Sequence, residues 1–229
     1  MKRILQVFIK SIIAGIIIGI GGCAYTAMYS EHKIVGAILF SIALTLICSY
    51  KYLLYTGKVC YIFTFSKKDF LDLFITLIGN ILGTVLIAII FRNIFNIDQN
   101  IIQGLIYNKL NTPWYELILK GIMCGILICF AVNTFNANRK YAEWILTLCV
   151  IVFILCGFEH SIADTFYLQL DNRISIHSVL TIVYVVIGNS IGGIIIPGLT
   201  ILTEKLNNKS SRKEENKNEW RIKQRFSTK

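Results

Sequence analysis

The sequence predicts an all-α membrane protein with six transmembrane helices. Of its 229 residues, 55% are hydrophobic and only 16% are charged, and the mean hydropathy is +0.64. The run from Ile174 to Thr203 contains no Asp, Glu, Lys or Arg, and the run from Ile4 to Ser30 contains only Lys10. Both runs exceed the ~20 residues that cross ~30 Å of hydrocarbon. Lipid offers the backbone no water to bond, so these runs should be helices.

The second and fifth membrane segments are expected to be broken. Each has an uncharged stretch of only 15 to 17 residues before a polar interruption, at 51–58 and at 158–164. At ~1.5 Å per residue such a stretch is too short for a full crossing. Residues 96–112 are expected to form a loop, with Thr112 as the N-cap and Pro113 as the first residue of the fourth helix. The six segments are expected at about 4–29, 34–65, 70–95, 112–136, 142–170 and 174–204.

The basic residues predict the orientation. Under this topology one side holds most of the Lys and Arg residues, so the positive-inside rule places both termini in the cytoplasm of a multi-pass protein of the cell membrane. The first apolar run is too long for the h-region of a cleavable signal. The basic residues of the cytoplasmic side are Lys2, Arg3, Lys10, Lys67, Lys68, Arg139, Lys140 and those of the tail, and those of the other side are Lys33, Lys109 and Arg173, with Arg92 near its edge.

The chain divides into a transmembrane domain, residues 1–205, and a basic cytoplasmic tail, residues 206–229. Nine of the 23 Lys and Arg residues lie between Lys205 and Lys229, in a polar stretch without apolar periodicity. We expect this tail to be disordered or only transiently helical. A solvated tail that marks orientation is favoured over weak contact with anionic lipid headgroups. No recognition module accompanies the net charge of +10, so nucleic acid is not an expected partner.

A short motif occurs twice at equivalent places. Gly79-Asn80-Ile81-Leu82-Gly83 in the third segment recurs as Gly188-Asn189-Ser190-Ile191-Gly192 in the sixth, 109 residues later. Small residues four apart allow close helix packing, and a buried Asn can bond across helices. Two copies in two three-helix halves indicate an internal duplication. Because three spans per half is odd, the halves must be inverted in the membrane.

Cysteine and histidine patterns give no indication of a cofactor. The seven cysteines lie in or beside apolar segments, without a Cys-x-x-Cys pair and without a His at metal-ligand spacing. Buried structural thiols are therefore expected, and no metal or other cofactor. No nucleophile–base pair or phosphate-binding glycine loop is visible, which argues against an enzyme.

The strongest functional candidate is the pair Glu159-His160, which directly follows the uncharged run from Trp144 to Phe158. Ionisable residues at membrane depth are costly to bury and usually mark a functional site. Broken helices at corresponding places in two halves indicate a central transport site. The sequence therefore predicts such a site around the two breaks.

These motifs resemble one known family. Phe158-Glu159-His160-Ser161-Ile162-Ala163 resembles the signature at the fifth-helix break of the formate/nitrite transporter family, which includes formate, nitrite and hydrosulfide channels. Leu54-Tyr55-Thr56-Gly57 resembles the Leu-Phe-Thr loop that breaks the second helix of the family. The two Gly-Asn-x-x-Gly copies also fit, and the resemblance covers about residues 4–204.

The resemblance implies an aquaporin-like protomer in a homopentamer, with one pore per protomer. It implies small monovalent anions or their conjugate acids as substrates, with protons and membrane lipid as the other partners. It makes His160 the central pore histidine, Thr56 the loop threonine and Lys109 a lysine near the outer vestibule, with Phe158 lining the centre. The outer constriction would contain Phe40 and Phe153, and the inner one Leu44, Leu54, Tyr55 and Ile128.

Four positions depart from the family pattern. Asp164 stands where the family usually has Asn and adds a negative charge close to the anion path. Gly125 stands where some formate channels carry Asn, so a polar side chain is expected to be absent from the lumen. Tyr55 replaces the usual Phe, and Lys58 stands where Asn is common.

The physics of the apolar constrictions predicts how transport works. A bare ion meets an idealised cost of about 20 kcal/mol in a low-dielectric region, whereas a neutral weak acid meets far less. Lys109 would attract the anion, and His160, whose ordinary pKa is near neutral, would donate a hydrogen bond or a proton. Thr56 would orient the ring or bond the substrate. Glu159 is expected to support the loop, because a carboxylate would repel an anion.

Two other functions remain open at this stage. A neutral-solute channel of the aquaporin kind would need two Asn-Pro-Ala boxes, and the only prolines are Pro113 and Pro197. A membrane enzyme or a non-transporting scaffold is the third alternative. The leading interpretation is a channel or proton-coupled transporter for formate, nitrite, hydrosulfide or a similar small anion.

Overall fold

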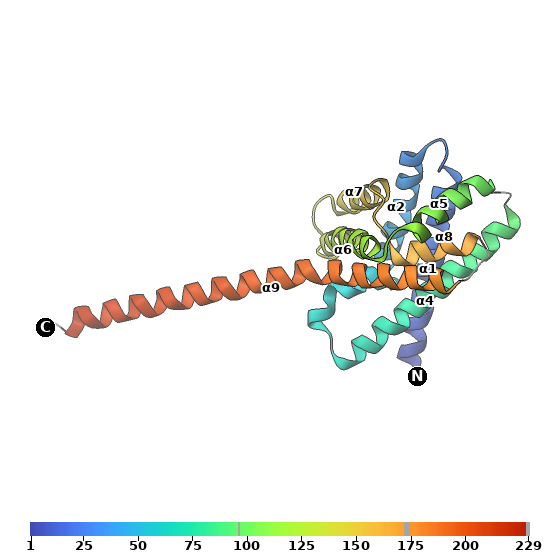
Figure 1. Cartoon of the computed structure of the whole chain (residues 1–229). Helices are drawn as coiled ribbons and strands as arrows, with labels where there is room; N and C mark the ends of the chain where they lie inside the picture. Colours follow the sequence, from blue (N-terminus) through green and yellow to red (C-terminus); the bar gives the residue numbers. More distant parts are fainter. Residues whose placement is uncertain (96, 172–174, 228–229) are drawn as a thin grey trace.

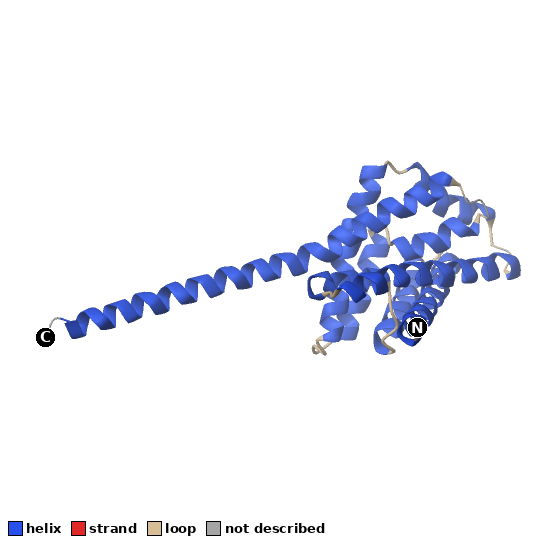
Figure 2. Cartoon of the chain, turned by 90° about the horizontal axis from the view of Figure 1, so that it is seen from below, coloured by secondary structure: helices blue, strands red, loops and turns tan. Residues whose placement is uncertain are grey.

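The computed structural model describes residues 1–95, 97–171 and 175–227, and within helix α9 it describes side chains only as far as residue 207. Every regular element in these ranges is helical (Figure 2). The helices form one bundle, from which the C-terminal part of α9 projects as a single long rod (Figure 1). The all-α membrane protein predicted from the sequence is thus confirmed.

Four helices are long and apolar enough to cross a membrane. They are α1 (Lys2–Ala27), α4 (Lys67–Ile94), α6 (Trp114–Asn136) and residues 176–207 of α9 (Ile176–Ser227). Two helices are shorter, α2 (Lys33–Ser49) and α7 (Ala142–Leu155), and each is followed by a break and a second short piece. After α2 these pieces are α3 (Tyr55–Lys58) and the 3-10 helix η1 (Val59–Thr64), and after α7 the piece is α8 (Ser161–Leu170).

The long helices pack in two pairs through glycines, α1 against α4 and α6 against α9. A Cβ atom at Gly15 would lie 2.2 Å from the carbonyl oxygen of Asn80, and one at Gly125 would lie 2.4 Å from that of Asn189. Neither position tolerates a side chain while the backbones are this close, which is the contact predicted from the repeated motif. Gly125 therefore faces the backbone of α9, and the expectation that it faces the lumen was wrong.

Both breaks end earlier than the sequence predicted. The chain resumes as helix at Tyr55 and at Ser161, so Thr56 and Asp164 lie in short helices and not in the interruptions. The predicted ends of both breaks lay too far along the chain because Lys58 and Asp164 were taken as polar loop residues. Both side chains instead have charged partners inside the bundle.

A loop was expected at residues 96–112, but most of the described residues from 97 to 112 are helical. Helix α5 (Gln99–Asn111) begins after Asp98, whose carboxylate accepts a hydrogen bond from the Asn100 N–H at 2.9 Å. Its buried residues are Ile102, Leu105 and Ile106, a helical spacing in a stretch whose polar residues masked the pattern. The Thr112 hydroxyl donates back to the Asn108 carbonyl, and α6 begins at Trp114 with Pro113 as its N-cap.

The backbone of α9 continues as helix through the tail to Ser227. A disordered or only transiently helical tail was expected, so its backbone is more regular in this structure than the sequence suggested. Both views show that this part of α9 leaves the bundle (Figures 1 and 2). The domain boundary at residue 205 and the behaviour of the tail in solution stay predictions. Arg173, expected on the side opposite the tail, lies outside the described residues.

Candidate functional site

Two buried asparagines hold the two breaks in the same way. The side chain of Asn80 accepts from the Tyr55 N–H and donates to the carbonyls of Ser11 and Leu53, each at 2.8 Å. Both carbonyl partners come from elements other than α4, so one amide ties α1 and the first break to the middle of that helix. The broken backbone would otherwise leave these groups unpaired at membrane depth.

Asn189 repeats the arrangement in the second half. Its side chain accepts from the Ser161 N–H and donates to the carbonyls of Gly121 and Glu159, each at 2.9 Å. The residue between the two clamped groups is His160 here and Leu54 in the first half. The sequence predicted that a buried Asn of this motif bonds across helices, and the bonds to Ser11 and Gly121 confirm it.

The structure brings His160 and Thr56 together. Thr56 Oγ1 lies 3.0 Å from His160 Nε2, and both residues are buried, at 0% and 3% exposed. His160 Nδ1 accepts the N–H of Ala163 at 3.2 Å, so the ring also serves as the N-cap of α8. The Phe153 ring stacks on the imidazole with centroids 5.8 Å apart.

These contacts define which ring nitrogen carries the proton. Because Nδ1 accepts a backbone N–H, the proton of a neutral imidazole lies on Nε2. Nε2 then donates to Thr56 Oγ1. The hydroxyl hydrogen of Thr56 has no acceptor among the described residues, although the residue is fully buried and lines neither of the two cavities described next.

A first cavity of about 170 Å³ lies on one side of this pair. Phe40, Phe153 and Phe158 contribute its apolar wall, and the edges of the Phe40 and Phe153 rings meet with centroids 6.2 Å apart. His160 lies on the same wall. The cavity is therefore lined by the aromatic residues and the histidine that the sequence predicted, together with Tyr25, Tyr29 and Tyr167, which it did not. Tyr167 is three residues after Asp164 and seven after His160, a helical spacing that would have indicated it.

A second cavity of about 320 Å³ lies at the other end of α2. Leu44 and Leu54 line it, as do the lysines Lys51 and Lys58. Phe40 lines the first cavity and Leu44 the second, and four residues of helix correspond to ~6 Å. Only about one helical turn of apolar wall therefore separates the two cavities along α2.

Lys109 lies in a buried charged cluster. Its ammonium pairs with the Glu159 carboxylate and with Asp164 Oδ1, the latter at 2.6 Å, and lies 5.5 Å from the ring centre of Tyr167. One cation thus faces two carboxylates. The sequence predicted a lysine free to attract anions, whereas the structure shows a lysine with two acidic partners. The sequence did not predict that Glu159, the expected loop support, would pair with this lysine.

Asp164 has one oxygen without a partner. Its side chain is 2% exposed, and Oδ2 makes no hydrogen bond to any described residue. A buried carboxylate oxygen in this state is costly unless it is protonated or bonded to water or a ligand. Asp164 lines the first cavity, so a ligand in that cavity would lie near this residue.

Two residues predicted at the inner constriction line neither cavity. The Tyr55 hydroxyl lies 2.8 Å from Ser190 Oγ on α9, and Ile128 is 1% exposed inside α6. Both pack in the core beside the pathway. Within the described part of the chain, no group of three His, Cys, Asp or Glu residues is placed to hold a metal ion, and all seven cysteines are free thiols.

Comparisons with known proteins identify the family of this chain. The formate/nitrite transporter family model matches residues 1–203. The chain is 29% identical to the nitrite transporter NirC of Escherichia coli strain K12 over 110 residues, a stretch that covers 43% of this chain and only 40% of that relative. It is 25% identical to the formate channel FocA of the same strain over 245 residues, covering 87% of this chain and 86% of FocA. A solved structure described as a pentameric formate channel with formate bound shares the fold, with a TM-score of 0.76 and 21% identity over 90% of this chain and 98% of that chain. The chain is thus a multi-pass membrane protein that belongs to the formate/nitrite transporter family.

Proposed function

We propose that this chain is a channel or proton-coupled transporter for small monovalent anions of the formate and nitrite type, hydrosulfide included. Family membership supports this function, as do the names of NirC and FocA. The observation that carries the proposal is the thin apolar wall between two cavities, with a buried Thr56–His160 pair beside it.

The apolar wall selects against charge. A bare anion would lose its hydration between Phe40 and Leu44, whereas the conjugate acid loses little. We propose that the anion enters the first cavity, takes a proton that originates in bulk water, crosses as the neutral acid, and releases the proton in the second cavity. One proton then accompanies each anion.

The Thr56–His160 pair orients the substrate for that step. With Nε2 donating to Thr56, the threonine hydroxyl accepts the ring hydrogen and keeps its own hydrogen for a substrate that crosses between the two cavities. The Ala163 N–H keeps Nδ1 as an acceptor, so the ring keeps one orientation and one tautomer. A substrate oxygen would therefore meet a fixed donor on its way through the apolar wall.

The finer architecture is part of the same proposal. Two three-helix halves with equivalent asparagine clamps support an inverted repeat with six spans. The likeness to a channel described as pentameric supports a homopentamer with one pathway per protomer. The clustered basic residues support cytoplasmic termini.

A substrate panel tests the function. Purified protein in proteoliposomes should take up formate, nitrite and hydrosulfide faster as the pH falls toward their acid forms, and should not take up glycerol. His160→Phe should abolish uptake, and Thr56→Val, which keeps the shape but loses the hydroxyl, should lower it at least tenfold. Both variants should elute as the wild-type oligomer. Uptake of glycerol but of no weak acid would instead support a neutral-solute channel, and normal anion uptake by His160→Phe would refute the role of the ring.

A further inference from the structure

The second cavity carries positive charge that its own lining does not balance. Lys51 and Lys58 both line it, and the described residues that line it include no Asp or Glu. The first cavity is the opposite case, because its one lysine is paired with two carboxylates. The two ends of the pathway therefore present different fields to an approaching anion.

Lys58 is the more enclosed of the two lysines. Its side chain is 17% exposed, and its only ion pair within the described part of the chain is with Asp72 Oδ2, at 3.9 Å. Its ammonium makes no hydrogen bond to any described residue, although it has three N–H donors. An enclosed ammonium with unused donors is a site that favours an anionic acceptor.

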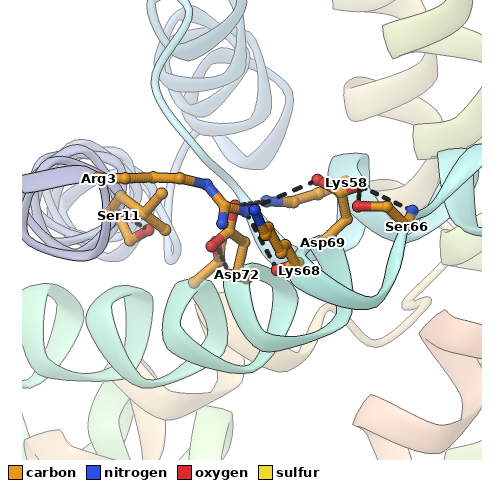
Figure 3. A network of polar contacts seen from close by, with 9 residues as sticks. Arg3, Ser11, Lys58, Ser66, Lys68, Asp69 and Asp72 are labelled. Atoms are coloured by element: carbon orange, nitrogen blue, oxygen red, sulfur yellow. Dashed lines mark hydrogen bonds and ion pairs between the residues drawn. The ribbon is translucent and has the colours of Figure 1, made fainter. Parts of the chain in front are cut away.

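Asp72 is held by another cation. Arg3 of α1 bonds Asp72 Oδ2 directly and also lies 3.9 Å from Asp69. Figure 3 shows Arg3 and Lys58 approaching Asp72 from opposite sides. Its other oxygen, Oδ1, is buried and has no hydrogen-bond partner among the described residues, so the side-chain hydrogen bond of this carboxylate is the one to Arg3. Arg3 thereby competes with Lys58 for Asp72, and the charge of Lys58 is only partly balanced.

Lys58 is also close to the apolar wall. It is the last residue of α3, and its backbone N–H donates to the carbonyl of Leu54 at 2.9 Å. Leu54 lines the second cavity on the wall side. An anion bound to Lys58 would therefore lie about one helical turn from the apolar wall, which it crosses only as the neutral acid.

We propose that Lys58 is an anion-docking residue of the second cavity, and that the Arg3–Asp72 pair keeps its ammonium available. This site rests on the proposed function. It takes monovalent anions of formate or nitrite size, which accept two hydrogen bonds from an ammonium. Lys58 stands where the family resemblance leads us to expect Asn. The docking site is therefore proposed for this chain and not for the fold.

The test is the concentration dependence of uptake measured separately at each membrane face. Initial rates of labelled formate uptake are recorded with right-side-out and with everted vesicles that contain the full chain. At low concentration a passive pathway has equal permeability in both directions, so the informative quantity is the half-saturating formate concentration. Lys58→Gln should raise that concentration about fivefold at the face to which the second cavity opens, equivalent to about 1 kcal/mol, and should not change it at the other face.

Three further variants make the result specific. Lys68→Gln removes a charge at the same end of the bundle, outside the cavity lining, and should leave both values at wild type. Lys58→Arg should stay close to wild type. Asp72→Asn removes the competing carboxylate and should lower the half-saturating concentration at the second-cavity face, which tests the site even if Lys58→Gln fails to assemble.

The outcomes separate the two proposals. Wild-type vesicles that transport no weak-acid anion would overturn the proposed function and this site with it. Wild-type transport with an unchanged half-saturating concentration in both Lys58→Gln and Asp72→Asn would overturn the docking site alone. An equal shift in Lys68→Gln would also overturn it, because general surface charge would then explain the effect.

Discussion

The asparagine clamps make a prediction whose size follows from the structure. Asn189→Ala removes three hydrogen bonds, those to the Ser161 N–H and to the Gly121 and Glu159 carbonyls. Interhelical hydrogen bonds in membranes are worth about 0.6 kcal/mol each, which gives ~2 kcal/mol for three. The Ser161 N–H and the Glu159 carbonyl lie at the break in buried residues and would be left unpaired, which adds about 1 kcal/mol or more each, so we expect the free energy of unfolding to fall by ~3–5 kcal/mol.

Asn80→Ala is the matched control, because Asn80 makes the same three kinds of bond in the other half. Both variants should lose similar stability. Their effects on transport should differ, because Asn189 fixes the backbone on both sides of His160 while Asn80 fixes it on both sides of Leu54. Misplacing the imidazole that orients the Thr56 hydroxyl should reduce transport more than misplacing one apolar side chain.

Thermal unfolding of the detergent-solubilised oligomer and formate flux in proteoliposomes measure the two effects. Flux is compared at a temperature where both variants remain assembled, so that loss of protein does not mimic loss of activity. If Asn189→Ala unfolded at the wild-type temperature and kept wild-type flux, the amide would not be holding the break. If Asn80→Ala lost more flux than Asn189→Ala, the assignment of different tasks to the two breaks would be wrong.

Two further predictions concern departures from the family pattern. Asp164→Asn replaces the carboxyl group that has an unpaired oxygen and leaves Lys109 with one acidic partner. Flux of formate should rise about two- to fivefold at neutral pH because the ammonium then has one competitor fewer for the anion, and unchanged or lower flux would contradict this. Gly125→Asn should prevent assembly of a stable oligomer, because its Cβ atom would lie 2.4 Å from the Asn189 carbonyl oxygen, and size-exclusion chromatography should then show aggregate. Gly104→Asn is the control, since a Cβ atom at Gly104 meets nothing within 4 Å.

The fold was predictable because lipid imposes strong rules on the sequence. Apolar run length identified the long helices, and the short runs before 51 and 158 identified the broken ones. The repeated Gly-Asn-x-x-Gly motif located the close helix contacts, because few other residues permit them. Helix α5 was missed because its three buried residues lie among Asn, Gln and Lys, in a stretch that does not cross the membrane.

The residues of the site were largely predictable from the sequence, whereas the contacts between them were less so. His160 and Thr56 were expected at one centre, and they lie 3.0 Å apart. That Lys109 would pair with two acidic residues was not predictable, because α5 and α8 are far apart in sequence and the charge of each residue taken alone suggests steering. The sequence also did not predict that Gly125 faces α9, because only the packing of α6 on α9 decides which side of α6 is in contact.

The two halves use one backbone device for two chemical purposes. An asparagine from α4 or α9 clamps the groups on either side of one residue, and that residue is Leu54 in the first half and His160 in the second. The apolar side chain and the imidazole are therefore held by the same kind of backbone geometry. Because the imidazole comes from only one half, the proposed pathway has distinct ends. The paired Lys109 and the incompletely balanced Lys58 extend that difference to the two cavities, so an anion meets a different field at each face.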